Sequence, residues 1–161
     1  MRFRRVSINI MVLFMVAIVV CGMTSHFEIK KKVIGKEQFI DLASNSGFQV
    51  EDSTYQYEQV SGLKSAIHAY NSDGSLVYEF YTFNDQDTAD LEFDIFRKTL
   101  DDSFNAANDS SYSGENYLVY NMSDAQEYHH LCAVDNTLFY AKSPDANKDE
   151  VRDFAKVVGY N

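Results

Sequence analysis

Two apolar stretches joined by a short polar turn place the tightest constraint on the fold of this chain. Residues 66–70 and 76–83 flank Asn71-Ser72-Asp73-Gly74, and an Asp-Gly pair supplies the positive φ that a hairpin turn needs. The second stretch, Leu-Val-Tyr-Glu-Phe-Tyr-Thr-Phe, is apolar on both faces. It therefore predicts a central strand of an antiparallel sheet, covered on one side and packed with aromatic residues on the other.

The rest of the domain predicts three helices and three further strands. Helices are expected at residues 36–46 and 88–103 and from about residue 147 to Gly159, each from apolar residues at helical spacing. Residues 117–120, 128–134 and 138–141 indicate strands, and the polar stretch 103–116 indicates an exposed loop. The predicted fold class is α+β, in the order α-β-β-α-β-β-β-α, with an antiparallel sheet of about five strands and helices on one face.

A hairpin followed by an acidic turn and a helix occurs twice in this order. Phe80-Tyr81 precedes the helix that contains Leu100, and Phe139-Tyr140 precedes the helix that contains Val158. Such units arise from duplication, or simply because antiparallel sheets are covered in this way. Both explanations stay open at this point.

The N-terminal segment differs in composition from the rest. Three arginines precede an apolar run from Ile8 to Met23, and Lys30, Lys31 and Lys32 follow it. This pattern is typical of a secretory signal or a membrane anchor, at the short end of the roughly 17–25 residues that a span requires. We expect residues 1–24 to be a signal peptide or anchor, 25–35 a juxtamembrane linker and 36–161 a single domain.

Three fates of this segment stay open. Cleavage after Gly22 places Val20 and Gly22 at the small-residue positions. Cys21, at the end of the apolar run, suggests lipidation, and an uncleaved helix is the third alternative. The expected localisation is the cell membrane with the domain on the outer face, and secretion is the alternative.

Charge excludes one class of partner. All 24 acidic residues follow the apolar segment, whereas Arg2, Arg4 and Arg5 of the 14 basic residues precede it, so the domain is more acidic than the chain's net charge of −10. Nucleic acid is therefore not expected as a partner, because phosphate binding needs clustered Lys and Arg. The expected partners are the membrane, through the N-terminal segment, and a protein.

Residues that could carry catalysis or hold a metal are few. His130 and Cys132 are two apart on a predicted strand and share a face, so with His68 they form a hypothetical metal site. Acidic residues at 84–87 and 145–149 precede helices, where capping explains them better than calcium. Nucleophile motifs and phosphate-binding glycine loops are absent from the sequence. We therefore expect no cofactor and no catalytic residues.

Aromatic residues are the remaining candidates for ligand binding. An uncovered sheet face would present tyrosines as anchors for a ligand or a protein, although aromatic residues also suit the interior of a sheet. The candidates on the predicted strands are Tyr78, Phe80, Tyr128 and Tyr140.

Three segments carry a resemblance to a family. They are Tyr78-Glu79-Phe80-Tyr81-Thr82-Phe83, Val134-Asp135-Asn136-Thr137-Leu138 and the closing Asp149-Glu150-Val151 with Gly159-Tyr160. In these the chain resembles small exported proteins of Gram-positive bacteria, often lipoproteins, whose function is unknown. The resemblance implies export and assigns no functional residues.

The sequence supports one main functional hypothesis and two alternatives. The main hypothesis is a membrane-tethered or exported, non-catalytic binding or accessory module. The first alternative is a regulatory subunit of a membrane complex. The second is a metal-assisted hydrolase that uses His68, His130 and Cys132.

Overall fold

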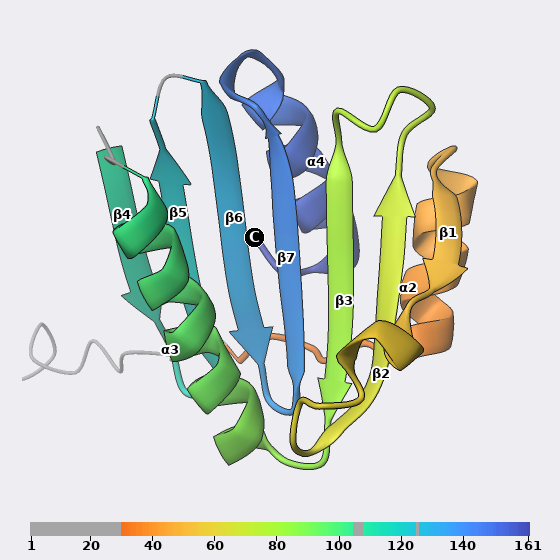
Figure 1. Ribbon diagram of the computed structural model, residues 1–161, viewed down its shortest axis with the longest axis vertical. Helices are drawn as coiled ribbons and strands as arrows, with labels where there is room; N and C mark the ends of the chain where they lie inside the picture. Colours follow the sequence, from red (N-terminus) through yellow and green to blue (C-terminus); the bar gives the residue numbers. More distant parts are fainter. Residues whose placement is uncertain (1–29, 105–107, 125) are drawn as a thin grey trace, which may run out of the picture.

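A single antiparallel sheet organises the chain in the computed structural model, which describes residues 30–104, 108–124 and 126–161 (Figure 1). Its seven strands are arranged in the order β1-β2-β3-β7-β6-β5-β4. Their bounds are β1 Gln49–Asp52, β2 Leu63–Tyr70, β3 Val77–Phe83, β4 Asn108–Ser113, β5 Tyr117–Ser123, β6 Glu127–Val134 and β7 Thr137–Pro144. The α+β class and the antiparallel sheet are confirmed, but the prediction of about five strands is wrong.

Helices cover both faces of the sheet, not one face as predicted. The helices α2 (Lys36–Asn45) and α4 (Lys148–Val158) lie behind the sheet in Figure 1, and α3 (Gln86–Ser103) lies in front of it. Two short 3-10 turns, η1 (Thr54–Tyr57) and η2 (Asp145–Asn147), complete the described elements. The two covered faces are called the α4 face and the α3 face below.

Helices must cover both faces of the sheet because the central strands carry apolar side chains on each face. Tyr78 and Phe80 of β3 pack with Phe139 of β7 under α2 and α4. Tyr81 and Phe83, one position along, pack on the other face under α3. Since successive side chains of a strand point to opposite faces, a strand that is apolar at every position requires a layer on each side.

The extra strands lie at or near the edges of the sheet, where the sequence carries little apolar signal. All six residues of β4 are exposed, and backbone pairing with β5, from Asn108 opposite Ser123 to Ser113 opposite Leu118, holds it in place. The loop predicted for residues 103–116 is therefore wrong over this strand. At the other edge, β1 pairs with β2 from Gln49 opposite Tyr70.

The two hairpin-helix units are not related as a simple repeat. Strands β3 and β7 lie antiparallel at the centre, with Phe80 opposite Phe139. A two-fold rotation that exchanges antiparallel neighbours keeps each face of the sheet on the same side. Yet α3 and α4 pack in different core clusters on opposite faces, so the rotation does not bring one helix onto the other.

The predictions for the N-terminal segment, including Cys21, fall outside the described residues. Within residues 30–104, 108–124 and 126–161, none of the helices combines the length and the apolar character needed to cross a membrane.

Candidate functional site

A polar groove lies on the α4 face, between α4 and the outer strands β4 and β5. One part has a volume of about 210 Å³ and a neighbouring part about 300 Å³. Both parts are lined by Ser110, Asn121, Tyr128 and Arg152. The groove exists because α4 covers the middle of the sheet and leaves this face of β4 and β5 open.

One wall of the groove is a basic stripe on α4. Lys148, Arg152 and Lys156 are spaced by four residues and line the groove, because residues four apart lie on one side of a helix. The buried residues of α4 lie on the adjacent side against the sheet, and they are Val151, Phe154, Ala155 and Val158; Ala155 also lines the groove. A helix with such a divided surface packs in only one rotation, which directs the three cations toward β4 and β5.

Each cation of the stripe has an acidic neighbour three residues before it. Arg152 Nη1 lies 3.2 Å from Asp149 Oδ1, and Lys156 Nζ lies 2.8 Å from Asp153 Oδ1. Both carboxylates are strongly exposed, at 84% and 75% of the side chain. Exposed pairs of this kind contribute only about 0–1 kcal/mol, so a bound anion can compete for these cations.

The third cation is held more firmly. Lys148 Nζ lies 3.1 Å from Asp145 Oδ2, and the hydroxyl of Ser123 donates to the same carboxylate at 2.6 Å. These contacts lower the pKa of Asp145, with the hydrogen bond from Ser123 as the largest cause. Lys148 therefore belongs to the frame of the groove, whereas Arg152 and Lys156 are free to turn toward a ligand.

Arg152 is also placed by an aromatic ring. Its guanidinium carbon lies 5.3 Å from the ring centre of Tyr128, within the range of a cation–π contact. Tyr128 itself is 3% exposed. The contact holds the guanidinium beside the groove, and a guanidinium suits the binding of carboxylate or phosphate oxygens.

The floor of the groove contains a closed hydrogen-bond network around His130. Its Nδ1 lies 2.7 Å from the side-chain amide of Asn121, and its Nε2 lies 2.7 Å from the carbonyl oxygen of Tyr160. Burial lowers the pKa of His130 to about 4, so the ring is neutral at pH 7 and carries one N–H. Both neighbouring atoms are oxygens, and the single N–H donates to one of them.

Asn121 connects this histidine with the groove. Its Oδ1 lies 2.7 Å from His130 Nδ1 and accepts a hydrogen bond from the hydroxyl of Tyr128 at 2.8 Å. Its Nδ2 donates to Ser110 Oγ at 3.4 Å. Asn121 therefore joins His130, Tyr128 and Ser110 in one network along the floor of the groove.

The structure divides the residues proposed from the sequence. Tyr128 and His130 line the groove. Tyr78 and Phe80 are fully buried between the sheet and the two helices, so neither presents a ring to a ligand. Tyr140 lies on the opposite face, 9% exposed, where its hydroxyl contacts His129 Nδ1 at 2.8 Å.

The proposed metal ligands are not brought together. His68 packs on the α3 face, 3.4 Å from Glu51, whereas His130 and Cys132 face α4. Cys132 is fully buried, and burial raises the pKa of its thiol to about 12. Among the described residues no group of three or more His, Cys, Asp or Glu side chains is placed to hold a metal. The structure therefore does not support a site made of these three residues.

Sequence reasoning missed several residues of the groove. Two of them, Ser110 and Tyr112, lie on β4, in the stretch that was predicted to be a loop. The spacing of Lys148, Arg152 and Lys156 was visible in the sequence. Its meaning depends on the open neighbouring strands, which the sequence pattern did not indicate.

Comparisons with known proteins show the fold and no family. No protein-family model matches the chain, and no curated protein matches it. Among solved structures, a GTP-binding regulator from Thermotoga maritima is similar, with a TM-score of 0.50 and 12% sequence identity, covering 78% of this chain and 88% of that chain. At this identity the similarity concerns the fold alone.

Proposed function

We propose that this chain is a non-catalytic binding module, tethered to or exported across the membrane by its N-terminal segment, which binds a small organic anion in the groove beside α4. The observation that carries the proposal is the basic stripe of α4 along a polar floor, in a chain whose net charge is −10. Three cations line the groove against one carboxylate, Asp109, and the aspartates paired with Arg152 and Lys156 are strongly exposed, so an anionic ligand can compete for these two cations.

The floor of the groove supports binding over catalysis. Both ring nitrogens of His130 are engaged by neighbouring groups, and its pKa of about 4 leaves it without a proton to donate as an acid at pH 7. Cys132 is too deeply buried to serve as a nucleophile. His130 positions Asn121, which in turn contacts Tyr128.

The ligand class follows from the groups on the two walls. Arg152 and Lys156 offer charged donors, and Asn121, Ser110 and Tyr128 offer neutral hydrogen-bonding groups. Carboxylate and phosphate oxygens match this set. The similar Thermotoga protein is described as a GTP-binding regulator, and GTP belongs to the same class of oxygen-rich anions, so it is one member of the test panel.

The test is calorimetric titration of the full-length protein in detergent with inorganic phosphate, succinate and GTP. Arg152→Gln should lower the affinity for the anion at least about tenfold, since a charge-assisted hydrogen bond is lost. Arg97→Gln is the matched control, because Arg97 on α3 also stacks on a tyrosine ring, at 5.2 Å from Tyr120, and also has an acidic neighbour, Asp101.

Two results would contradict the proposal. One is that none of the three anions binds the unmodified protein. The other is that Arg97→Gln weakens binding as much as Arg152→Gln, which would assign the effect to total charge and not to the groove.

A further inference from the structure

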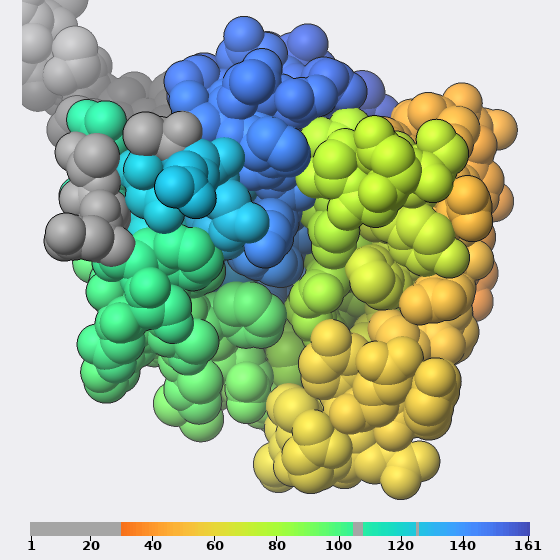
Figure 2. Space-filling view, turned by 45° about the horizontal axis from the view of Figure 1, so that its top comes forward, coloured from red at the N-terminus to blue at the C-terminus, as the bar shows by residue number. Residues whose placement is uncertain are grey.

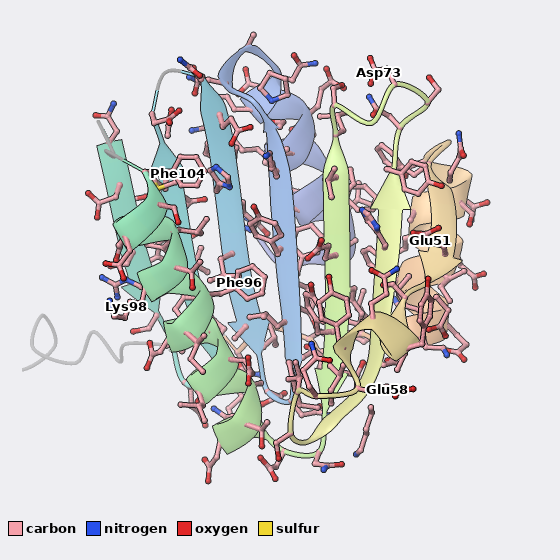
Figure 3. All side chains as sticks on the ribbon, in the orientation of Figure 1. Glu51, Glu58, Asp73, Phe96, Lys98 and Phe104 are labelled. Atoms are coloured by element: carbon pink, nitrogen blue, oxygen red, sulfur yellow. The ribbon has the colours of Figure 1, made fainter. Side chains whose placement is uncertain are left out.

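A second cavity lies on the opposite face of the sheet, between α3 and the segment that contains η1. Its volume is about 40 Å³. Buried side chains of the sheet, among them Tyr81 and Phe83, form its floor. Tyr57 and Phe96 stand on either side of it, and Figure 3 shows Phe96 reaching from α3 over the sheet. In the space-filling view the surface dips between α3 (green) and the η1 segment (yellow) (Figure 2).

The aromatic rings around this cavity meet at different angles and form a cage. Tyr57 and Tyr81 are perpendicular, with ring centres 5.4 Å apart and an interplanar angle of 88°. Phe96 lies 6.1 Å from Tyr81 at 52°, and Phe83 lies 6.4 Å from Tyr81 at 26°. An aromatic ring attracts a cation over its electron-rich face, and proteins bind alkylammonium groups in cavities lined by several such rings.

The neighbours of Tyr81 increase the attraction of its ring for a cation. Its hydroxyl donates a hydrogen bond to the carboxylate of Glu79. Burial and the neighbouring Glu79 both raise the pKa of Tyr81. A phenol that donates to a carboxylate gains electron density in its ring, which strengthens the attraction of the ring for a cation.

A carboxylate without a partner stands at the edge of the cavity. Glu92 of α3 lines it, and no ion pair or side-chain hydrogen bond to Glu92 occurs among the residues that the structure describes. Burial raises the pKa of this carboxyl. A negative group that is partly removed from water and has no described counter-charge is a place where a bound cation is stabilised.

We propose that this cavity binds an organic ammonium group, held by Tyr57, Tyr81, Phe83 and Phe96 and neutralised by Glu92. A single water needs about 10–15 Å³ of a cavity of this kind, so 40 Å³ accommodates a small branched head group and excludes a large ring. The acidic domain attracts cations to its surface. The site is on the face opposite the groove and does not depend on the function proposed above.

The experiment compares a cation with its neutral isostere on the full-length protein in detergent. Choline and 3,3-dimethylbutan-1-ol have nearly the same shape and differ in charge, and Nα-acetyl-lysine amide represents a protein-borne ammonium. Binding is followed by the intrinsic tyrosine fluorescence and by calorimetry. We expect choline or the lysine derivative to bind at least about tenfold more tightly than the alcohol, and the tighter of the two identifies the source of the ammonium group.

Three variants locate the binding. Tyr57→Leu keeps the wall of the cavity apolar and removes the ring, and Glu92→Gln removes the negative charge. Each should lower the affinity for the cation about fivefold or more. Glu58→Gln is the control, because Glu58 is exposed and absent from the cavity lining yet carries the same charge next to Tyr57 (Figure 3).

The proposal fails if the alcohol binds as tightly as choline, since the cavity is then a general apolar pocket. It also fails if Glu58→Gln and Glu92→Gln have equal effects, because the attraction is then due to total charge. Absence of binding by both cations to a protein that still unfolds cooperatively overturns it as well.

Discussion

His130 shows how one buried residue can make stability depend on pH. Its pKa in the folded protein is about 4, below the ordinary value of 6.5, because burial disfavours the charged ring. As the pH falls from 6.5 to 4, the unfolded chain takes up this proton and the folded chain does not. The free energy of unfolding therefore decreases through this window, by about 1.4 kcal/mol per pH unit for each such proton.

The corresponding variant is His130→Gln, measured by urea unfolding at several pH values between 4 and 6.5. We expect lower stability at pH 6.5, from the altered network, and a slope shallower by about one proton. His129, whose pKa burial also lowers, accounts for part of the remaining slope. Asp90 and Glu92 have the opposite effect on stability. Burial raises their pKa values, so the folded protein takes up their protons before the unfolded chain does, and their protonation increases the free energy of unfolding as the pH falls. If the free energy of unfolding changes with pH equally in the two proteins, His130 is not responsible for the pH dependence.

At the level of single residues the sequence identified part of the groove. Tyr128 and His130 were candidates because of their chemistry. Arg152 and Asn121 were not, because an arginine on an exposed helical face and an asparagine in a strand are ordinary until their neighbours are known. Tyr78 and Phe80 were assigned to a binding face because aromatic residues suit both an interior and a surface, and only the position of α2 and α4 over them separates the two cases.

The helix α4 connects the core with the groove, and two substitutions along it should separate these roles. Phe154 packs against Tyr78, with ring centres 4.5 Å apart, and against Phe48 at 5.2 Å. Phe154→Ala should lower the free energy of unfolding by about 3–5 kcal/mol, because a large buried ring is lost.

Val157 on the same helix is 56% exposed, and Val157→Ala is the matched control. It should change stability by less than about 0.5 kcal/mol. Urea unfolding of both variants gives the comparison. Similar losses in the two would mean that α4 does not pack on the sheet through the face described here.

At the level of elements, strong periodic patterns predicted most of the structure. The helix bounds agree within about two residues with those expected, as is usual at helix ends. Strand β4 could not be predicted, because its residues are all exposed and it owes its conformation to backbone pairing with β5. The placement of α3 opposite α4 was also not predicted, since an apolar pattern on both sides of β3 does not say which helix covers which side.

At the scale of the whole molecule, the folded domain and the N-terminal segment are expected to have separate roles. We predict that the full-length protein sediments with membranes and that a variant lacking residues 2–24 does not. Cys21→Ala distinguishes the means of attachment: release of this variant indicates a lipid, and retention indicates a helix. Intact mass measurement of the N-terminus checks both, and a soluble protein that begins near Met23 would contradict the tethered arrangement.

Because Cys132 is buried, the chemical modification of its thiol reports local opening of the fold. The thiol lies in the interior beneath α4, and a pKa of about 12 keeps it protonated under ordinary conditions. A thiol-modifying reagent can reach it only when α4 separates from the sheet. In a Cys21→Ala background, the rate of its modification therefore measures the free energy of that local opening. The same burial keeps Cys132 from pairing with a foreign thiol in an oxidising compartment.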